Sequence, residues 1–146
     1  MLPRPLVCLL ALVFVSGSAW AEPDNSTDLR TIMQGLRDDT VAIFDALMVE
    51  DFEKVVAAAD RIANHPRIPP DQVKRVAAEL GEEMSAFKHM DHQVHDLSLS
   101  ISAAAQDNDR ISAFADYKKM LDGCMACHAS YRDRVATALS QPAGDK

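Results

Sequence analysis

Apolar residues recur at helical spacing in four stretches, and this periodicity limits the fold more than any other feature. The stretches cover approximately residues 27–49, 51–65, 71–106 and 111–135. Spacings of three, four and seven residues place their apolar side chains on one face of a helix, and few runs alternate as strands do. Four amphipathic helices on short links predict an all-α fold, an antiparallel up-down-up-down four-helix bundle.

Turn and cap residues suggest where these helices begin and end. Ser26 or Thr27 is the expected N-cap of the first helix. The second should end at His65, because a proline disfavours helical geometry in the residue before it, and residues 66–70 then form a stiff connector. The third stretch is expected to run as one helix, although Gly81 within it weakens that prediction.

The chain opens with the pattern of a secretory signal peptide. Arg4 precedes an apolar run over residues 6–15, and Ala19-Trp20-Ala21 matches a signal-peptidase site. The run is shorter than the roughly 20 residues of a membrane-spanning helix, although an uncleaved anchor is the alternative. We therefore predict a signal peptide over residues 1–21 and one exported domain over residues 22–146.

Charge limits the partners of this domain. Removal of the signal takes away one basic residue, Arg4, and no acidic one, so the net charge changes from −7 to −8. An acidic surface disfavours nucleic acid and anionic membrane surfaces as partners, and it permits docking to a basic protein. No nucleophile–base pair or phosphate-binding loop occurs in a convincing setting, so no enzyme activity is expected.

Cys8 leaves with the signal, and the two remaining cysteines lie in the sequence CMACH at Cys124, Cys127 and His128. A disulfide over so short a loop would restrain the unfolded chain little. A redox dithiol normally opens a helix after a strand, and no strand precedes this pair. A zinc site needs about four ligands. The candidates for the others are His89, His92 and His95, which belong to another helix and mostly face away from the core.

The remaining interpretation is the covalent attachment of one haem c. The pattern C-x-x-C-H lets two thiols bond the haem vinyl groups, while the adjacent histidine ligates the iron. Cys124 and Cys127 are therefore the predicted attachment residues, and His128 is the predicted axial ligand. Leu121, Cys124, His128 and Val135 fall within about 60° on a helical wheel, so His128 is expected to face the core. Bacteria attach this haem outside the cytoplasm, which predicts a periplasmic location.

The position of the motif near the C-terminus resembles the class II cytochromes c, the family of cytochrome c′ and its low-spin relatives. The resemblance rests on CMACH, on the aromatic–arginine pair Tyr131-Arg132, and on residues 30–33, Arg-Thr-Ile-Met. It implies a bundle with covalent haem that transfers single electrons to redox partner proteins. It also implies a methionine of the first helix, here Met33, as the distal iron ligand. A homodimer is compatible with the family, although the sequence shows no apolar helix face that is clearly left over for an interface.

Bundle geometry agrees with Met33 as a ligand. His128 lies about 19 residues, roughly 28 Å, from the turn at Asp109, and Met33 lies about 16 residues, roughly 24 Å, from the turn at Val49. The two residues would therefore share a level, and Met33 belongs to the apolar seam of its helix. Met84 and Met90 on the third stretch are rival ligands.

Two other functions stay open. If no residue fills the sixth position, the resemblance implies a five-coordinate protein of the cytochrome c′ type that binds nitric oxide or carbon monoxide. Outside haem chemistry, the chain would be a helical dithiol or a partner-binding module.

Other polar residues carry weaker predictions. His89 and His92 should be solvated, and Asp91 should lie toward the core and pair with His95 one turn later. Candidate partners for a haem propionate are Arg67, Lys74 and Arg132.

Overall fold

The computed structural model describes residues 27–141, and this part of the chain is helical without a strand. The predicted signal peptide, residues 1–21, lies outside the described residues. No helix within the described range is both long and apolar enough to cross a membrane. The elements are α1 (Leu29–Met48), α2 (Phe52–Ala63), α3 (Pro70–Leu80), the 3₁₀ turn η1 (Gly81–Glu83), α4 (Met84–Gln106) and α5 (Arg110–Ser140).

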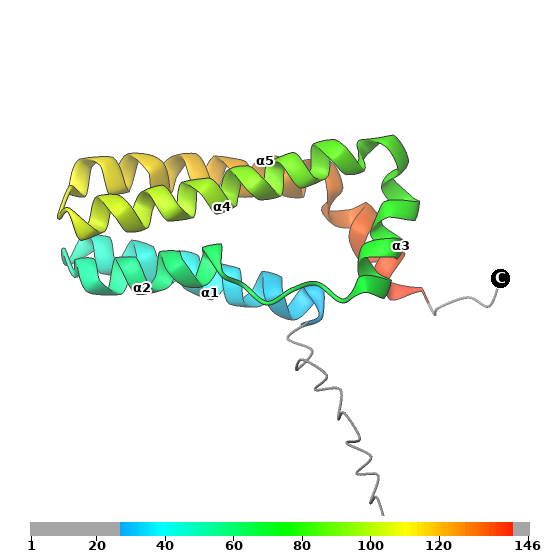
Figure 1. Cartoon of the computed structure of the whole chain (residues 1–146), viewed down its shortest axis with the longest axis horizontal. Helices are drawn as coiled ribbons and strands as arrows, with labels where there is room; N and C mark the ends of the chain where they lie inside the picture. The colour runs from blue at the N-terminus through cyan, green and yellow to red at the C-terminus, as the bar shows by residue number, and fades with distance from the viewer. Residues whose placement is uncertain (1–26, 142–146) are drawn as a thin grey trace, which may run out of the picture.

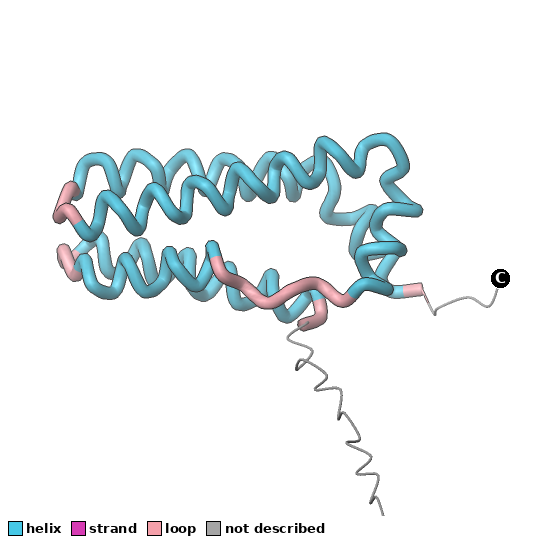
Figure 2. The backbone as a smooth tube through the Cα atoms, in the orientation of Figure 1, coloured by secondary structure: helices cyan, strands magenta, loops and turns pink. Residues whose placement is uncertain are grey.

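Four of these helices, α1, α2, α4 and α5, pack against each other, which confirms the prediction of an all-helical protein built on four packed helices. The α1–α2 turn and the α4–α5 turn lie together at one end of the molecule (Figure 1). An ion pair between Glu50 and Arg110 joins these two turns. At the other end, α3 lies across the molecule, and the long loop from α2 to α3 leads to it (Figure 2).

Aspartates begin three of the helices. The carboxylates of Asp28, Asp51 and Asp109 accept hydrogen bonds from backbone N–H groups in the first turns of α1, α2 and α5. The predicted cap of the first helix was therefore wrong, because Asp28 and not Ser26 or Thr27 fills this position.

The third apolar stretch is not one helix, which corrects the prediction. Gly81 has φ 53° and ψ −122°, a conformation that side chains with a Cβ rarely adopt, and the chain turns there from α3 through η1 into α4. The apolar spacing continues across the break, so periodicity alone could not reveal it.

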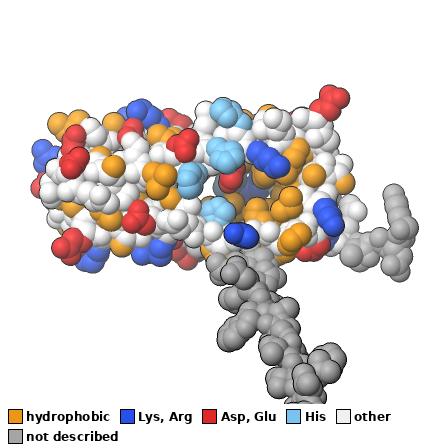
Figure 3. Space-filling view, viewed as in Figure 1, with side chains coloured by type: hydrophobic (Ala, Val, Ile, Leu, Met, Phe, Trp, Pro, Cys, Tyr) orange, Lys and Arg blue, Asp and Glu red, His pale blue; other side chains and the backbone are white. Residues whose placement is uncertain are grey.

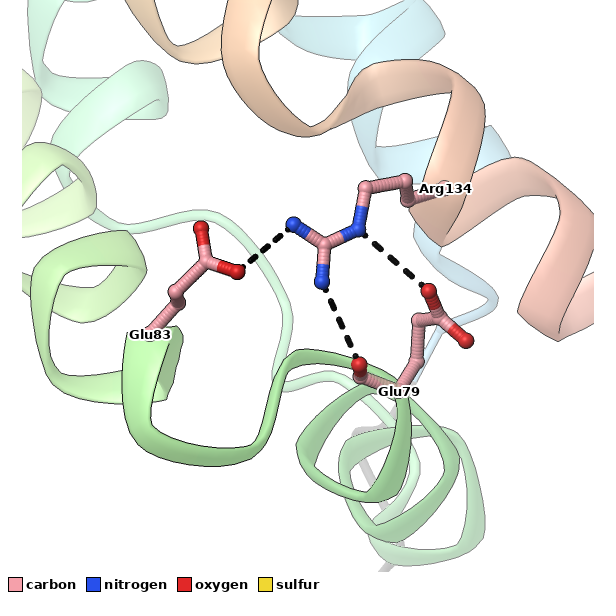
Figure 4. Close-up of polar contacts among 3 residues, drawn as sticks. All are labelled: Glu79, Glu83 and Arg134. Atoms are coloured by element: carbon pink, nitrogen blue, oxygen red, sulfur yellow. Dashed lines mark hydrogen bonds and ion pairs between the residues drawn. The ribbon is translucent and has the colours of Figure 1, made fainter.

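Arg134 fastens α3 and η1 to α5 (Figure 4). Its guanidinium donates to the Glu83 carboxylate at 2.8 Å, and to the carboxylate and backbone carbonyl of Glu79 at 3.3 Å each. The rings of Phe87 and Tyr131 meet edge to face nearby, with centroids 5.5 Å apart, and join α4 to α5. The Arg134 contacts thus hold α3 and η1 against α5, and the aromatic pair holds α4 against α5.

Buried apolar residues form two separate clusters. The closed-end cluster lies among the four packed helices and includes Ile43, Val55, Ile101, Tyr117 and Met120. The open-end cluster lies against α3 and consists of Leu29, Val76, Leu80, Tyr131 and Val135. The molecule therefore has two cores rather than one continuous core.

Candidate haem site

The CMACH motif lies on α5 at the junction of the two cores. Cys124 packs against the closed-end cluster, and Cys127 packs against the open-end cluster. Both side chains are half-buried. The motif is thus placed where the bundle changes from four packed helices to the arrangement with α3.

The surface is hollowed beside this change in packing. Figure 3 shows a hollow with hydrophobic side chains around it and histidine side chains gathered along one edge. Exposed hydrophobic surface in a concavity is typical of sites for apolar ligands. A flat, mostly apolar group such as a porphyrin matches this kind of surface.

The two cysteines do not form a disulfide in the structure. Burial raises the pKa of the Cys124 thiol. Burial also raises the pKa of the Cys127 thiol, and the charges of Asp91 and Cys124 add to this effect. Reactive redox cysteines instead have a lowered pKa, because a nearby positive charge or a helix N-terminus stabilises their thiolate.

His128 is exposed, so the prediction that it is directed into a packed core was wrong. It follows the half-buried Cys124 by four residues and precedes the buried Tyr131 by three, so it lies about 40° and 60° from them on the helix. A helical wheel gives the direction of the His128 side chain relative to these neighbours. It does not show whether another helix packs against that side chain. The imidazole remains accessible as a ligand.

The Met33 side chain is also more exposed than its place among the apolar residues of the first helix predicted. Leu29 and Ile32 are buried, Leu36 is half-buried, and the Met33 side chain is 39% exposed. Met33 belongs to neither core cluster, whereas its rivals Met84 and Met90 pack against the open-end cluster. Met33 is therefore not held as a core side chain.

His95 makes a different contact from the one predicted. Its Nδ1 lies 3.0 Å from the backbone oxygen of Ala63, the last residue of α2, and no bond to Asp91 forms. A carbonyl only accepts, so Nδ1 carries the proton of this bond. Asp91 is exposed, yet its charge raises the pKa of Cys127. The carboxylate therefore lies near the cysteine motif, and sequence spacing within one helix gave no signal of this.

The other polar candidates lie on the surface. His89 and His92 are exposed, as predicted, and so are Arg67, Lys74 and Arg132. The Arg132 guanidinium is 3.9 Å from the carboxylate of its neighbour Asp133. Within the described residues, no ion pair with a buried partner holds Arg67, Lys74 or Arg132.

The donors of CMACH are of the kinds that a haem c takes from a protein. Within the part of the chain that the structure describes, no group of three or more His, Cys, Asp or Glu side chains is arranged to hold a metal ion. A haem brings four ring nitrogens of its own and needs from the protein only the thiols of Cys124 and Cys127 and an axial ligand such as His128. Comparisons with protein-family models, curated proteins and solved structures found no match to this chain.

Proposed function

We propose that this chain is a periplasmic c-type cytochrome that carries single electrons, with haem bound covalently through Cys124 and Cys127. The observation that carries the proposal is the position of CMACH at the junction of two apolar cores, with Cys124 packed against one and Cys127 against the other. The proposed architecture is an antiparallel up-down-up-down bundle. The likeness to the class II cytochromes c agrees with it, and no enzyme activity is part of the proposal.

His128 is the proposed proximal ligand, and Met33 is the proposed distal ligand. Two contacts near α1 and α5 support the proposal that Met33 and His128 lie at the same level along the bundle. Tyr117 Oη donates to the backbone oxygen of Thr40 at 3.1 Å, and Arg110 pairs with Glu50 nearer the turns. If α1 and α5 run in opposite directions, seven residues beyond the Tyr117–Thr40 contact lead to Cys124 on α5 and to Met33 on α1. Each lies about 10 Å further along its helix.

Bound haem would supply an iron that alternates between the ferric and ferrous states and so holds one electron. The chain's own residues would set the conditions for this chemistry. A thioether from Met33 would favour the ferrous state and raise the reduction potential. The Phe87–Tyr131 pair and the open-end cluster would keep water away from one side of the site. Redox partners would dock to the acidic surface.

One observation favours a second function. Met33 is 39% exposed and belongs to neither core cluster, so core packing does not fix the position of its sulfur. If it does not ligate, the distal side would be open, and the protein would bind nitric oxide or carbon monoxide. The raised pKa values of Cys124 and Cys127 argue against the third function, a reactive dithiol.

A visible spectrum of the matured ferric protein separates the first two functions. We expect a low-spin spectrum with the near-red absorption of a methionine–iron bond. Met33→Ala should abolish this band, lower the potential and let carbon monoxide bind the ferrous protein. Met48→Ala is the matched control, because Met48 is another exposed methionine of α1 near the opposite end.

A high-spin spectrum of the wild type would remove the electron-carrier proposal and favour gas binding. A low-spin spectrum that survives Met33→Ala, but not the loss of Met84 or Met90, would move the ligand to α4. Met84→Leu and Met90→Leu nearly conserve side-chain volume, so changes in packing should be small.

A further inference from the structure

Histidine side chains that the haem proposal does not use gather on one face of the molecule (Figure 3). Within the described residues, four histidines lie outside CMACH: His65 follows α2, and His89, His92 and His95 lie on α4. His65 and His95 are half-buried, whereas His89 and His92 are exposed. The half-buried pair is therefore held in place by its surroundings, which a ligand site requires.

His65 and His95 make the same kind of hydrogen bond to the backbone. The Nδ1 atom of His95 lies 3.0 Å from the oxygen of Ala63, and the Nδ1 atom of His65 lies 2.7 Å from the oxygen of Pro66. A carbonyl oxygen only accepts, so Nδ1 carries the proton in each ring. The Nε2 atom of each neutral ring then has a free lone pair, and neither Nε2 has a hydrogen-bond partner within residues 27–141.

Both rings are anchored to one short piece of backbone. Ala63 is the last residue of α2, and His65 and Pro66 follow it by two and three residues. His95 reaches this piece from α4, which packs against α2. The two histidines therefore come from different elements and meet at residues 63–66, where the long loop to α3 begins.

A proton fixed on one ring nitrogen is typical of histidines that bind metal ions. Such histidines almost always donate the other ring N–H to a carbonyl or a carboxylate, which fixes the tautomer and orients the ring. A structural role would explain the bond of His95, because carbonyls in the last turn of a helix such as α2 lack helical partners. It does not account for His65, which lies after the helix and bonds the carbonyl of the next residue.

We propose that His65 and His95 bind one divalent transition-metal ion through their Nε2 atoms, with water at the other coordination positions. Imidazole suits Cu²⁺, Ni²⁺ and Zn²⁺, and Cu²⁺ forms the strongest complexes of these ions. Within the described part of the chain, no third His, Cys, Asp or Glu side chain completes the site. The site is therefore open and exchangeable, unlike a structural site with four protein ligands. The net charge of −8 expected after signal removal favours the approach of a cation.

Calorimetric titration of the matured full chain with copper(II) chloride, in a buffer that does not bind metals, tests the proposal. His65→Asn and His95→Asn are the informative variants, because the asparagine amide nitrogen takes the place of Nδ1 and no atom takes the place of Nε2. Each should keep the backbone hydrogen bond and raise the dissociation constant for Cu²⁺ at least about tenfold. His89→Asn is the matched control, because His89 is an exposed histidine of α4, and it should bind Cu²⁺ as the wild type does.

Two further measurements separate the metal site from other effects. The circular dichroism and the visible spectrum of the variants should match the wild type, and the comparison holds with or without haem because CMACH is the same in all of them. His65 lies in a loop, so His65→Asn decides the question even where His95→Asn disturbs the packing of α4 on α2. Electron paramagnetic resonance of the bound Cu²⁺ should show coupling to two imidazole nitrogens.

Three results would overturn the proposal. The first is equal affinity of the wild type and the variant with both His65→Asn and His95→Asn. The second is a control, His89→Asn, that weakens binding as much as the two informative variants do. The third is bound Cu²⁺ that couples to fewer than two imidazoles in the wild type.

Discussion

The two ends of this molecule bury their apolar residues to different degrees. The closed-end cluster contains side chains with no exposed surface, among them Ile43, Val55, Ile101 and Met120. Every residue of the open-end cluster keeps some exposure, and the cysteine motif beside it is only half-buried. A four-helix bundle closes its core when all helices stay together. Where α3 crosses, the buried apolar residues form a separate and smaller cluster.

The largest expected effect comes from emptying the closed end. Ile101→Ala removes most of a side chain with no exposed surface, and should lower the free energy of unfolding by about 2–5 kcal/mol. Val135→Ala at the open end removes a smaller part of a side chain that keeps some exposure. This variant should lower the free energy of unfolding by less. Denaturant unfolding of the matured protein measures both. An equal loss for the two variants would contradict the difference between the ends.

A smaller effect should follow from cutting the link between α1 and α5. Tyr117 Oη to Thr40 is the one hydrogen bond between these helices among the described residues. Tyr117→Phe keeps the ring and should cost about 0.5–1.5 kcal/mol. If the link also sets the level of Met33, amide exchange near Met33 should quicken. Unchanged stability and exchange would mean that packing alone aligns α1 with α5.

Four apolar-periodic stretches could be predicted from the sequence, because each keeps helical spacing, and the proline at position 66 marked the end of α2. The break at Gly81 could not, since Leu80 and Met84 keep helical spacing across it. The exposure of His128 and the contact of His95 with Ala63 also escaped prediction. A helical wheel gives the direction of a side chain, and burial and partners depend on the helix opposite. Haem attachment and iron ligation stay predictions.

The smallest effect concerns the acid stability of the open end. A hydrogen bond from Gln72 of α3 is the main cause that lowers the pKa of Asp28 at the start of α1. A lowered pKa in the folded state adds stability above the pKa of the unfolded state, and this stability is lost as the pH falls through the folded value. Asp28→Asn should therefore reduce the loss of melting temperature between pH 5 and pH 3. A melting profile identical to the wild type would show that this link contributes nothing.

The central claim is that CMACH binds haem covalently, and the intact mass tests it most directly. The chain should be produced in a host that matures c-type cytochromes. We predict the mass of residues 22–146 plus one haem, retained under denaturing conditions. The variant with both Cys124→Ala and Cys127→Ala should show the bare polypeptide mass. A wild-type mass equal to the polypeptide alone, from a host that loads a control cytochrome, would contradict the account.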